Sequence, residues 1–506
     1  MNLRRILQVA LTAFLGQGIS IITQLLVPPF FLRFYPHGLE VYGEWIALSA
    51  SVNYLGTLNY GIQTYANNEM SILYNGGKTN AAKSVQASAL RFLLVLIGLF
   101  MFGGTSIFLI PISRWLKLTH VNSRDASLTL YLLILQMAVA MLFSLLTNSY
   151  MVVGKLHRGN YWGNGQRLCS VLCMSLAIPL KASFPALASI QLGSLLLFFF
   201  FVFVDIRRTA PILLPSLGHG SWKQVTSILK PSGHFGLIAM AGFLTWQAPV
   251  IVIQRFLGPA TVGVFALVRV VFQMSRQILS VASSMISQDI TLLVGQRDWV
   301  TLRRLYDLSE RVVLLLIPIV SIGSLLMCPF LFTVWLHKRN LYSPGLCILM
   351  AMLSAVLGIK EHKTQFQSSS NQHEALSVFV LCGYTCMLIA SIPMMKAFGL
   401  VGFMWTWILW EVIQTAFVLR LNNSLFPKEL QISINPVLRL VALMSVSVAI
   451  AVWPAYHEVT WPLSIVVVTA TGVSVILGVA AYFIFGLGEI RRLLQARLAN
   501  RLVANS

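Results

Sequence analysis

Charged residues are scarce in this chain, and acidic residues are the scarcest of them. Only 10% of its 506 residues are charged, and Asp and Glu number 15 against 36 for Lys and Arg. Hydrophobic residues make up 57%, with a mean hydropathy of +0.78. A water-soluble domain cannot bury so large an apolar fraction, so the composition excludes a soluble fold and predicts a membrane protein.

Several chemical motifs are also missing. No glycine-rich phosphate loop ending in Lys occurs, so we expect no ATP hydrolysis on this chain. The six cysteines form no CxxC pair, the histidines are scattered singly, and we predict no metal site and no cofactor. The longest predicted outer loop, 111–126, is short for a catalytic domain. The chain is therefore not expected to be an enzyme.

The apolar residues form separate long runs, as expected of about fourteen membrane-spanning helices in an all-α protein. The first run continues well past the length of a signal peptide and is taken as an uncleaved span. The predicted spans lie at about 6–32, 41–66, 87–110, 127–152, 166–181, 185–204, 234–256, 261–288, 312–335, 343–366, 375–395, 399–419, 436–455 and 461–485.

The net charge of +21 follows from the arrangement of these spans. Lys and Arg gather in alternate connections, which places both termini and residues such as Lys363 on the cytoplasmic side. They form no stripe interleaved with aromatic residues, so no nucleic-acid partner is expected. Lys360 falls near the end of a span, whereas Arg269 and Arg276 fall deep inside one.

The chain also contains a weak internal repeat. A shift of 220 residues aligns residues at matching places in their spans: Gly43 with Gly263, Glu69 with Asp289, and Arg91 with Arg311. This pattern predicts two six-helix halves related by an axis along the membrane normal, followed by two further helices. The predicted divisions are 1–205 for the first half, 206–233 for a cytoplasmic linker, 234–420 for the second half, and 421–506 for two additional helices and a basic tail.

Polar residues lie on one face of the first two helices of each half. We expect these faces to line a wet, substrate-binding cavity, cationic in the second half only. The candidate cavity residues are Arg269, Gln273, Arg276 and Gln277 in one span, Gln247, Gln254 and Arg255 in the preceding span, and Gln17, Gln24 and Asn53 in the first half.

Two readings of the charged residues stay open. An arginine in hydrocarbon is unfavourable by about 3 kcal/mol or more, so Arg269 and Arg276 should face water, an anion or a carboxylate, with Glu411 the best distant partner. Candidate residues for a cytoplasmic salt-bridge gate are Glu69, Arg91, Asp289 and Arg311. The alternative is that these four are ordinary interfacial charges.

The span plan, the polar first and second helices, and the stretch YGEWIALSASVNYLGTLNYGIQTYANNEM (42–70) resemble the multidrug/oligosaccharidyl-lipid/polysaccharide (MOP) exporter superfamily. Within it the chain looks like the polysaccharide-biosynthesis branch, the Wzx-type O-antigen flippases. The resemblance implies translocation of an undecaprenyl-diphosphate-linked oligosaccharide across the bacterial inner membrane. It also implies membrane lipid and polysaccharide polymerase or assembly proteins as partners. Whether H⁺ or Na⁺ is coupled stays open.

Three other functions are considered. A flippase for the peptidoglycan lipid precursor would also carry cationic cavity residues. A MATE-like drug or cation antiporter would need cavity carboxylates, and the first half has none inside its spans except at their ends. An intramembrane polysaccharide polymerase would need a larger outer loop, which makes it the most distant alternative.

Overall fold

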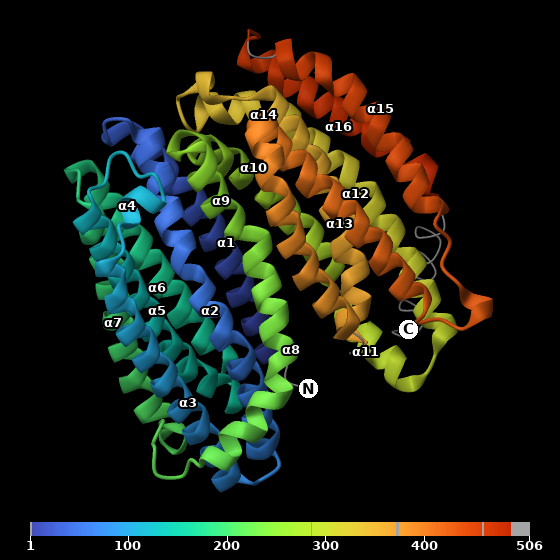
Figure 1. The fold of residues 1–506 in the computed structure, drawn as a ribbon. Helices are drawn as coiled ribbons and strands as arrows, with labels where there is room; N and C mark the ends of the chain where they lie inside the picture. The colour runs from blue at the N-terminus through green and yellow to red at the C-terminus, as the bar shows by residue number, and fades with distance from the viewer. Residues whose placement is uncertain (1–2, 285, 371–373, 458–459, 487–506) are drawn as a thin grey trace. The chain divides into compact units, whose positions relative to one another are not determined.

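The computed structural model describes residues 3–284, 286–370, 374–457 and 460–486, and these residues are almost entirely helical, with no β-strand among them (Figure 1). This confirms the all-α prediction. The α-helices are α1 (Leu3–Phe34), α2 (Gly38–Asn75), α3 (Thr79–Thr105), α4 (Ile112–Trp115), α5 (Ser123–Val152), α6 (Leu156–Ala177), α7 (Phe184–Thr209), α8 (Trp222–Trp246), α9 (Ala248–Leu257), α10 (Pro259–Ser284), α11 (Ser287–Gln296), α12 (Trp299–Val334), α13 (Pro344–Ser369), α14 (Glu374–Asn423), α15 (Asn435–His457) and α16 (Leu463–Phe485). Short 3₁₀ turns cover Ser106–Leu109, Ile178–Leu180, Pro211–Leu213, Arg339–Leu341 and Lys428–Leu430.

Within the described residues, 10 helices are long and apolar enough to cross a membrane. The chain is therefore a multi-pass membrane protein, although the predicted count of about fourteen spans stays a prediction. The helices α2, α6 and α8 are also long but are not among the ten. The long α14 contains a break at Gly399 (φ 59°, ψ −143°), where two predicted spans meet. Glycine adopts this backbone conformation without a Cβ clash.

Prolines affect two predicted spans differently. Pro28 and Pro29 lie inside α1, which continues through them to Phe34. The span predicted at 234–256 is instead divided at Gln247 into α8 and α9, with Pro249 in the first turn of α9. The missing N–H of proline is harmless there, because the first N–H groups of a helix have no partner in the helix.

The first compact unit comprises residues 1–266 together with Val380–Leu388. The long α2 is central to it and packs against α1, α3, α5, α8 and α9 (Figure 1). Beside it, α5 packs on α7 around a cluster that includes Phe143, Tyr150 and Val202. The boundary between the compact units falls inside α10, after Ala266, and not in the predicted linker at 206–233. The predicted repeat divisions therefore stay a separate hypothesis about the sequence.

The second unit comprises Leu267–Phe379 and Ile389–Ser506. Here α12 is central and packs against α13, α15 and α16. A cluster of Ile290, Leu302, Tyr306 and Phe366 joins α11, α12 and α13. Most of α13 is buried, so its side chains have protein on nearly every side.

Two glycines allow α2 and the start of α10 to cross closely within the first unit. A Cβ built on Gly43 would lie 2.1 Å from the carbonyl oxygen of Pro259, and one on Gly263 would lie 2.5 Å from the carbonyl oxygen of Leu39. The shift of 220 residues relates these contacts, because Leu39 aligns with Pro259 and Gly43 with Gly263. Such reciprocity is the pattern expected where a two-fold relation brings equivalent segments together. It supports the proposed repeat.

This crossing should tolerate no side chain. We expect Gly43→Ala and Gly263→Ala each to lower stability by about 1–3 kcal/mol, because the added Cβ would collide with a backbone carbonyl. The measurement is the thermal unfolding midpoint in detergent. The control is Gly98→Ala in α3, where nothing lies within 4 Å of the added carbon. Equal midpoints for the Gly43 and Gly98 variants would contradict the close crossing.

Candidate functional site

The second unit contains ion pairs on α13, where four consecutive residues, Lys360, Glu361, His362 and Lys363, can ionise. Lys363, which the sequence places on the cytoplasmic side, lies within α13, and its side chain is only 1% exposed. Its side of the membrane stays a prediction. Lys360 is likewise buried within α13. Charge in such surroundings requires a partner.

Two of these pairs are deeply buried. Lys363 Nζ donates to Glu310 Oε1 on α12, and this ammonium also lies 4.2 Å from the centre of the Tyr306 ring. Lys360 Nζ donates to Glu411 Oε2 on α14. The other oxygen of Glu411 accepts a hydrogen bond of 3.0 Å from Trp407 Nε1. These contacts join α13 to α12 and α14 and satisfy both buried cations.

Further polar contacts hold α13 against the same neighbours. His362 Nε2 lies 2.9 Å from Ser309 Oγ on α12. Asn422 Nδ2 on α14 donates to the Lys363 carbonyl oxygen at 2.9 Å, and Gln367 Nε2 donates to Asn422 Oδ1 at 2.7 Å. The register of α13 between α12 and α14 is therefore set by directional contacts as well as by packing.

A third pair is more open. Arg276 Nη1 of α10 donates to Glu361 Oε1 of α13, and each of these side chains is 21% exposed. Glu361 Oε2 is buried and has no hydrogen-bond partner among the described residues. The sequence suggested Glu411 as the long-range partner of Arg276, and the structure pairs Arg276 with Glu361. This pair is the most exposed of the three.

The remaining candidates of the cationic face lie on α10 as predicted. Arg269, Gln273 and Gln277 are all half-buried. Arg269 lies two helical turns before Arg276, about 10 Å along the axis. Gln277 Oε1 is buried without a hydrogen-bond partner in the described part of the chain. The face can therefore offer both cationic and amide groups, but its role as a cavity wall stays a prediction.

The other predicted cavity residues belong to the first unit and lie in different surroundings. Gln17 and Asn53 are exposed, and Arg255 is half-buried near the end of α9. The half-buried Gln24 bonds Ser20 of its own helix, with Nε2 and Oγ 3.3 Å apart. Gln247 occupies the break between α8 and α9.

Gln254 has a contact that the sequence did not indicate. It is fully buried, and its Nε2 donates to the carbonyl oxygen of Leu116 at 2.9 Å. It therefore holds the loop between α4 and α5, and its predicted contact with substrate stays a prediction.

The four candidate gate residues divide between the two units. In the first unit, Arg91 Nη2 donates to the carbonyl oxygen of Leu217 at 2.9 Å, and Glu69 is half-buried. In the second unit, Arg311 Nη1 donates to the carbonyl oxygen of Gly486 at 3.3 Å, and Asp289 is exposed in the first turn of α11. The gate stays a prediction.

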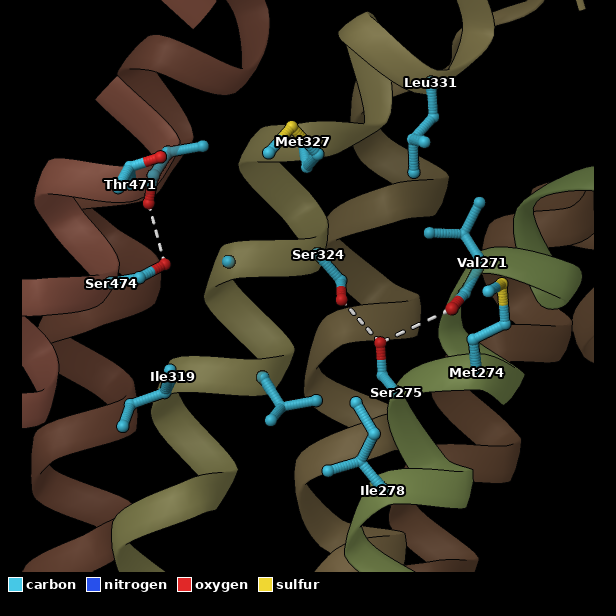
Figure 2. A pocket seen from close by; sticks show the side chains of 13 residues that line it. Val271, Met274, Ser275, Ile278, Ile319, Ser324, Met327, Leu331, Thr471 and Ser474 are labelled. Atoms are coloured by element: carbon cyan, nitrogen blue, oxygen red, sulfur yellow. Dashed lines mark hydrogen bonds between the residues drawn. The ribbon is translucent and has the colours of Figure 1, made fainter. Parts of the chain in front are cut away.

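An apolar pocket adjoins another face of α10. It has a volume of about 420 Å³ and lies among α10, α12 and α16, all within the second unit (Figure 2). Val271, Met274 and Ile278 line its α10 side, and Ser275 contributes a hydroxyl that bonds Ser324 of α12. Ser275 directly precedes Arg276, so one helix carries the open ion pair and a wall of the pocket.

The comparisons with known proteins concern the fold. No protein-family model and no curated protein matches this sequence. The chain is similar to the solved structure of the lipid II flippase MurJ in its inward closed conformation, with a TM-score of 0.69 and 11% identity over 96% of this chain and 99% of that one. It is also similar to the inward-facing conformation of a multidrug resistance MATE family transporter of the MOP superfamily (TM-score 0.60, 12% identity, 81% and 93% covered). A third similar structure is a ligand complex of the MATE multidrug transporter DinF-BH (TM-score 0.61, 16% identity, 83% and 95% covered).

These similarities show that the chain shares the fold of these three transporter structures. That confirms the fold implied by the sequence resemblance, whereas the polysaccharide branch stays a prediction. The match to the lipid II flippase covers 96% of the chain, so it must include most of α15 and α16. The matches to the two multidrug transporters cover 81% and 83%, and need not include those helices.

The two partners of a buried ion pair should contribute to stability together, so that their substitutions are not additive. We expect Lys363→Met to lower stability by about 3–5 kcal/mol, because it leaves the Glu310 carboxylate buried without its cation. Adding Glu310→Gln should restore much of that loss. The measurement is a double-mutant cycle of thermal unfolding in detergent, with Asp307→Asn of the partly exposed Arg303–Asp307 pair as control. Additive losses in the double variant would contradict direct pairing.

Proposed function

We propose that this chain is a flippase that moves undecaprenyl-diphosphate-linked oligosaccharide from the cytoplasmic to the periplasmic leaflet of the bacterial inner membrane by alternating access. The oligosaccharide would be a repeat unit of O-antigen, capsule or exopolysaccharide. Both termini would be cytoplasmic, and polysaccharide polymerase or assembly proteins would act next. We infer no catalytic step, and the coupling ion stays open.

The observation that carries this proposal is the partly open Arg276–Glu361 pair inside a membrane helix bundle. A guanidinium group binds phosphate through two parallel hydrogen bonds, the same geometry it offers a carboxylate. A diphosphate head group can therefore replace Glu361 as the partner of Arg276. The buried pairs of Lys360 and Lys363 would keep α13 in place during this exchange.

The exchange suggests how the head group is released as well as bound. While the diphosphate holds Arg276, Glu361 would turn to water or take up a proton. When the carboxylate regains the guanidinium, it would displace the diphosphate, so neither state leaves the arginine in an apolar environment without a partner. The Glu361 carboxylate and the diphosphate compete for Arg276. This competition keeps diphosphate binding weak enough for release, because the diphosphate must first displace an existing ion pair.

The pocket beside α10 suits the lipid part of the substrate. Its walls from α10, α12 and α16 are mostly aliphatic, with hydroxyls that bond within the protein. An isoprenoid chain in such a pocket would gain favourable dispersion contacts with the side chains that line it. We propose that it holds part of the undecaprenyl chain while Arg276 and Arg269 hold the diphosphate.

Amide groups from both halves of the sequence would bind the sugars. In this scheme Gln17, Gln24, Asn53 and Gln247 contact the sugars, as do Gln273 and Gln277, and Arg255 adds a further cation. Glu69, Arg91, Asp289 and Arg311 would form a cytoplasmic gate whose salt bridges break and re-form in each cycle. Gln254 acts at a distance by holding its loop.

A second candidate function is transport of the peptidoglycan lipid precursor. The match to the lipid II flippase over 96% of the chain favours it over drug transport. A drug or cation antiporter needs a carboxylate available to its cargo. Glu310, Glu361 and Glu411 of the second unit each have a Lys or Arg partner instead. A lipid diphosphate is common to both flippase functions, and the sugars distinguish them.

Substitutions on the two sides of the open pair should have opposite effects on ligand binding. We expect Arg276→Ala to weaken binding of undecaprenyl diphosphate about 10-fold or more, because a charge-assisted hydrogen bond is lost. Glu361→Gln should strengthen binding, because the competing carboxylate is removed. The measurement is titration of purified protein with this lipid by native mass spectrometry. If both variants weaken binding equally, the pair has only a structural role.

Filling the pocket should impair the binding of long isoprenoids only. Thr471 on α16 lines the pocket and is exposed. We expect Thr471→Trp to lower affinity for undecaprenyl diphosphate and to leave affinity for a short-chain analogue unchanged, because the indole would occupy the space of the chain. The control is Val475→Trp, one turn further along α16, where the side chain is exposed outside the pocket. Equal effects on the two lipids would place the chain elsewhere.

A further inference from the structure

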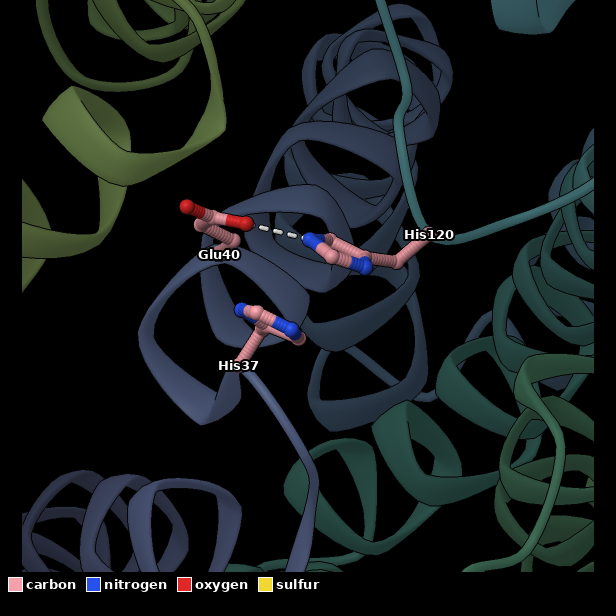
Figure 3. Close-up of side chains that lie close together, drawn as sticks. All are labelled: His37, Glu40 and His120. Carbon is pink, nitrogen blue, oxygen red and sulfur yellow. Dashed lines mark hydrogen bonds and ion pairs between the residues drawn. The ribbon is translucent and has the colours of Figure 1, made fainter.

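Two histidines and a glutamate that are distant in the sequence meet at one end of the first unit. His37 immediately precedes α2, Glu40 lies in its first turn, and His120 comes from the loop between α4 and α5 (Figure 3). Each offers one ligand atom, and these atoms lie within 4.8 Å of one another. Glu40 and His120 are 80 residues apart in the chain, so sequence spacing gave no sign of the group.

The donor set is suited to a divalent transition metal. Two imidazole nitrogens and one carboxylate oxygen form a ligand set typical of zinc sites that keep a fourth position for water. Tetrahedral zinc with bonds of about 2.0–2.2 Å places its ligands roughly 3.3 Å from one another. The His120 Nε2 atom already contacts Glu40 Oε2, and the rings of His37 and His120 stack with centroids 5.0 Å apart. Small side-chain rotations would therefore complete the geometry.

The loop that supplies His120 is held in place by buried side chains. Glu44, one turn after Glu40 on α2, is completely buried. Its Oε1 accepts hydrogen bonds from the backbone N–H of Thr119 and from that of His120, the latter at 3.0 Å. Gln254 holds the other end of the loop through the carbonyl of Leu116. Such support from outside the ligand set orients ligands before a metal arrives.

The backbone at His37 is also unusual. Its φ of 51° and ψ of 40° lie in the left-handed region, which few residues other than glycine adopt, although asparagine, aspartate and histidine are enriched there. The conformation turns the chain from α1 into α2 and projects the imidazole toward His120 (Figure 3). The first turn of α2 and the loop before α5 therefore present their ligands to the same point.

We propose that His37, Glu40 and His120 bind one divalent transition metal ion, with zinc the best match to the donors. The site shares no residue with the proposed substrate site of the second unit. By joining the start of α2 to the loop before α5, the ion would stabilise this end of the first unit. An ordinary ion pair between Glu40 and protonated His120 is the competing explanation, and it predicts no affinity for metal.

The test uses the full-length protein, purified with a tag free of histidine, stripped with EDTA and given zinc sulfate. After gel filtration we expect about one zinc per chain by elemental analysis, since tight sites retain their ion. His37→Asn should lose this zinc, and asparagine tolerates the left-handed backbone. Glu40→Gln and His120→Ala should lose it too. Added zinc should raise the thermal midpoint of the unaltered protein and not that of the variants.

The matched control is His337→Asn. His337 is also exposed, also has a left-handed φ of 53°, and lies in the other unit. It should keep the full zinc content. Cobalt substitution adds a spectroscopic check, since visible absorption bands should appear in the unaltered protein and in the control, and vanish in His37→Asn. No retained zinc in the unaltered protein, or unchanged zinc in all three site variants, overturns the proposal.

Discussion

A charge inside a membrane helix bundle must have a partner, and this requirement governs the second unit. The charged run of α13 would be unfavourable in lipid, yet it lies among α10, α12 and α14 with a partner for each cation. Because the partners come from three helices, the pairs specify which helices surround α13 and in what register. The apolar surfaces alone allow many more arrangements, since lipid and protein interiors are similarly apolar.

The same requirement accounts for a difference between the pairs. The pairs of Lys360 and Lys363 are buried. Arg276 and Glu361 are each 21% exposed, and the proposed function has a phosphate take the place of the carboxylate there. The buried pairs of Lys360 and Lys363 hold α13 in place next to the exchangeable pair. Arg276 and Glu361 would therefore move little when the ligand changes. A site for a charged lipid head group needs that property, because the same residues must bind and release it.

Much of the fold follows from the sequence, because apolar runs of sufficient length can only be satisfied as helices in lipid. The 220-residue shift also aligned Gly43 with Gly263, which lie at the same helix crossing. The ion pairs of α13 could not be predicted, for a physical reason. The charged run of this helix looks like the end of a span under the positive-inside rule, and partners 51 to 85 residues away are invisible to local patterns. The grouping of His37 with His120 was missed for the same reason. The helix breaks at Gln247, whereas α1 continues through its two prolines. This difference depends on tertiary packing, which cannot be predicted from the prolines alone.

The central claim is that this chain moves a lipid-linked oligosaccharide across the membrane. The most direct measurement compares spheroplasts with and without the gene, using a membrane-impermeant reagent that modifies sugars on the outer leaflet. The account predicts that deletion leaves undecaprenyl-diphosphate-linked oligosaccharide protected on the cytoplasmic side, and that restoring the gene makes it accessible. Equal accessibility in the two strains would contradict it.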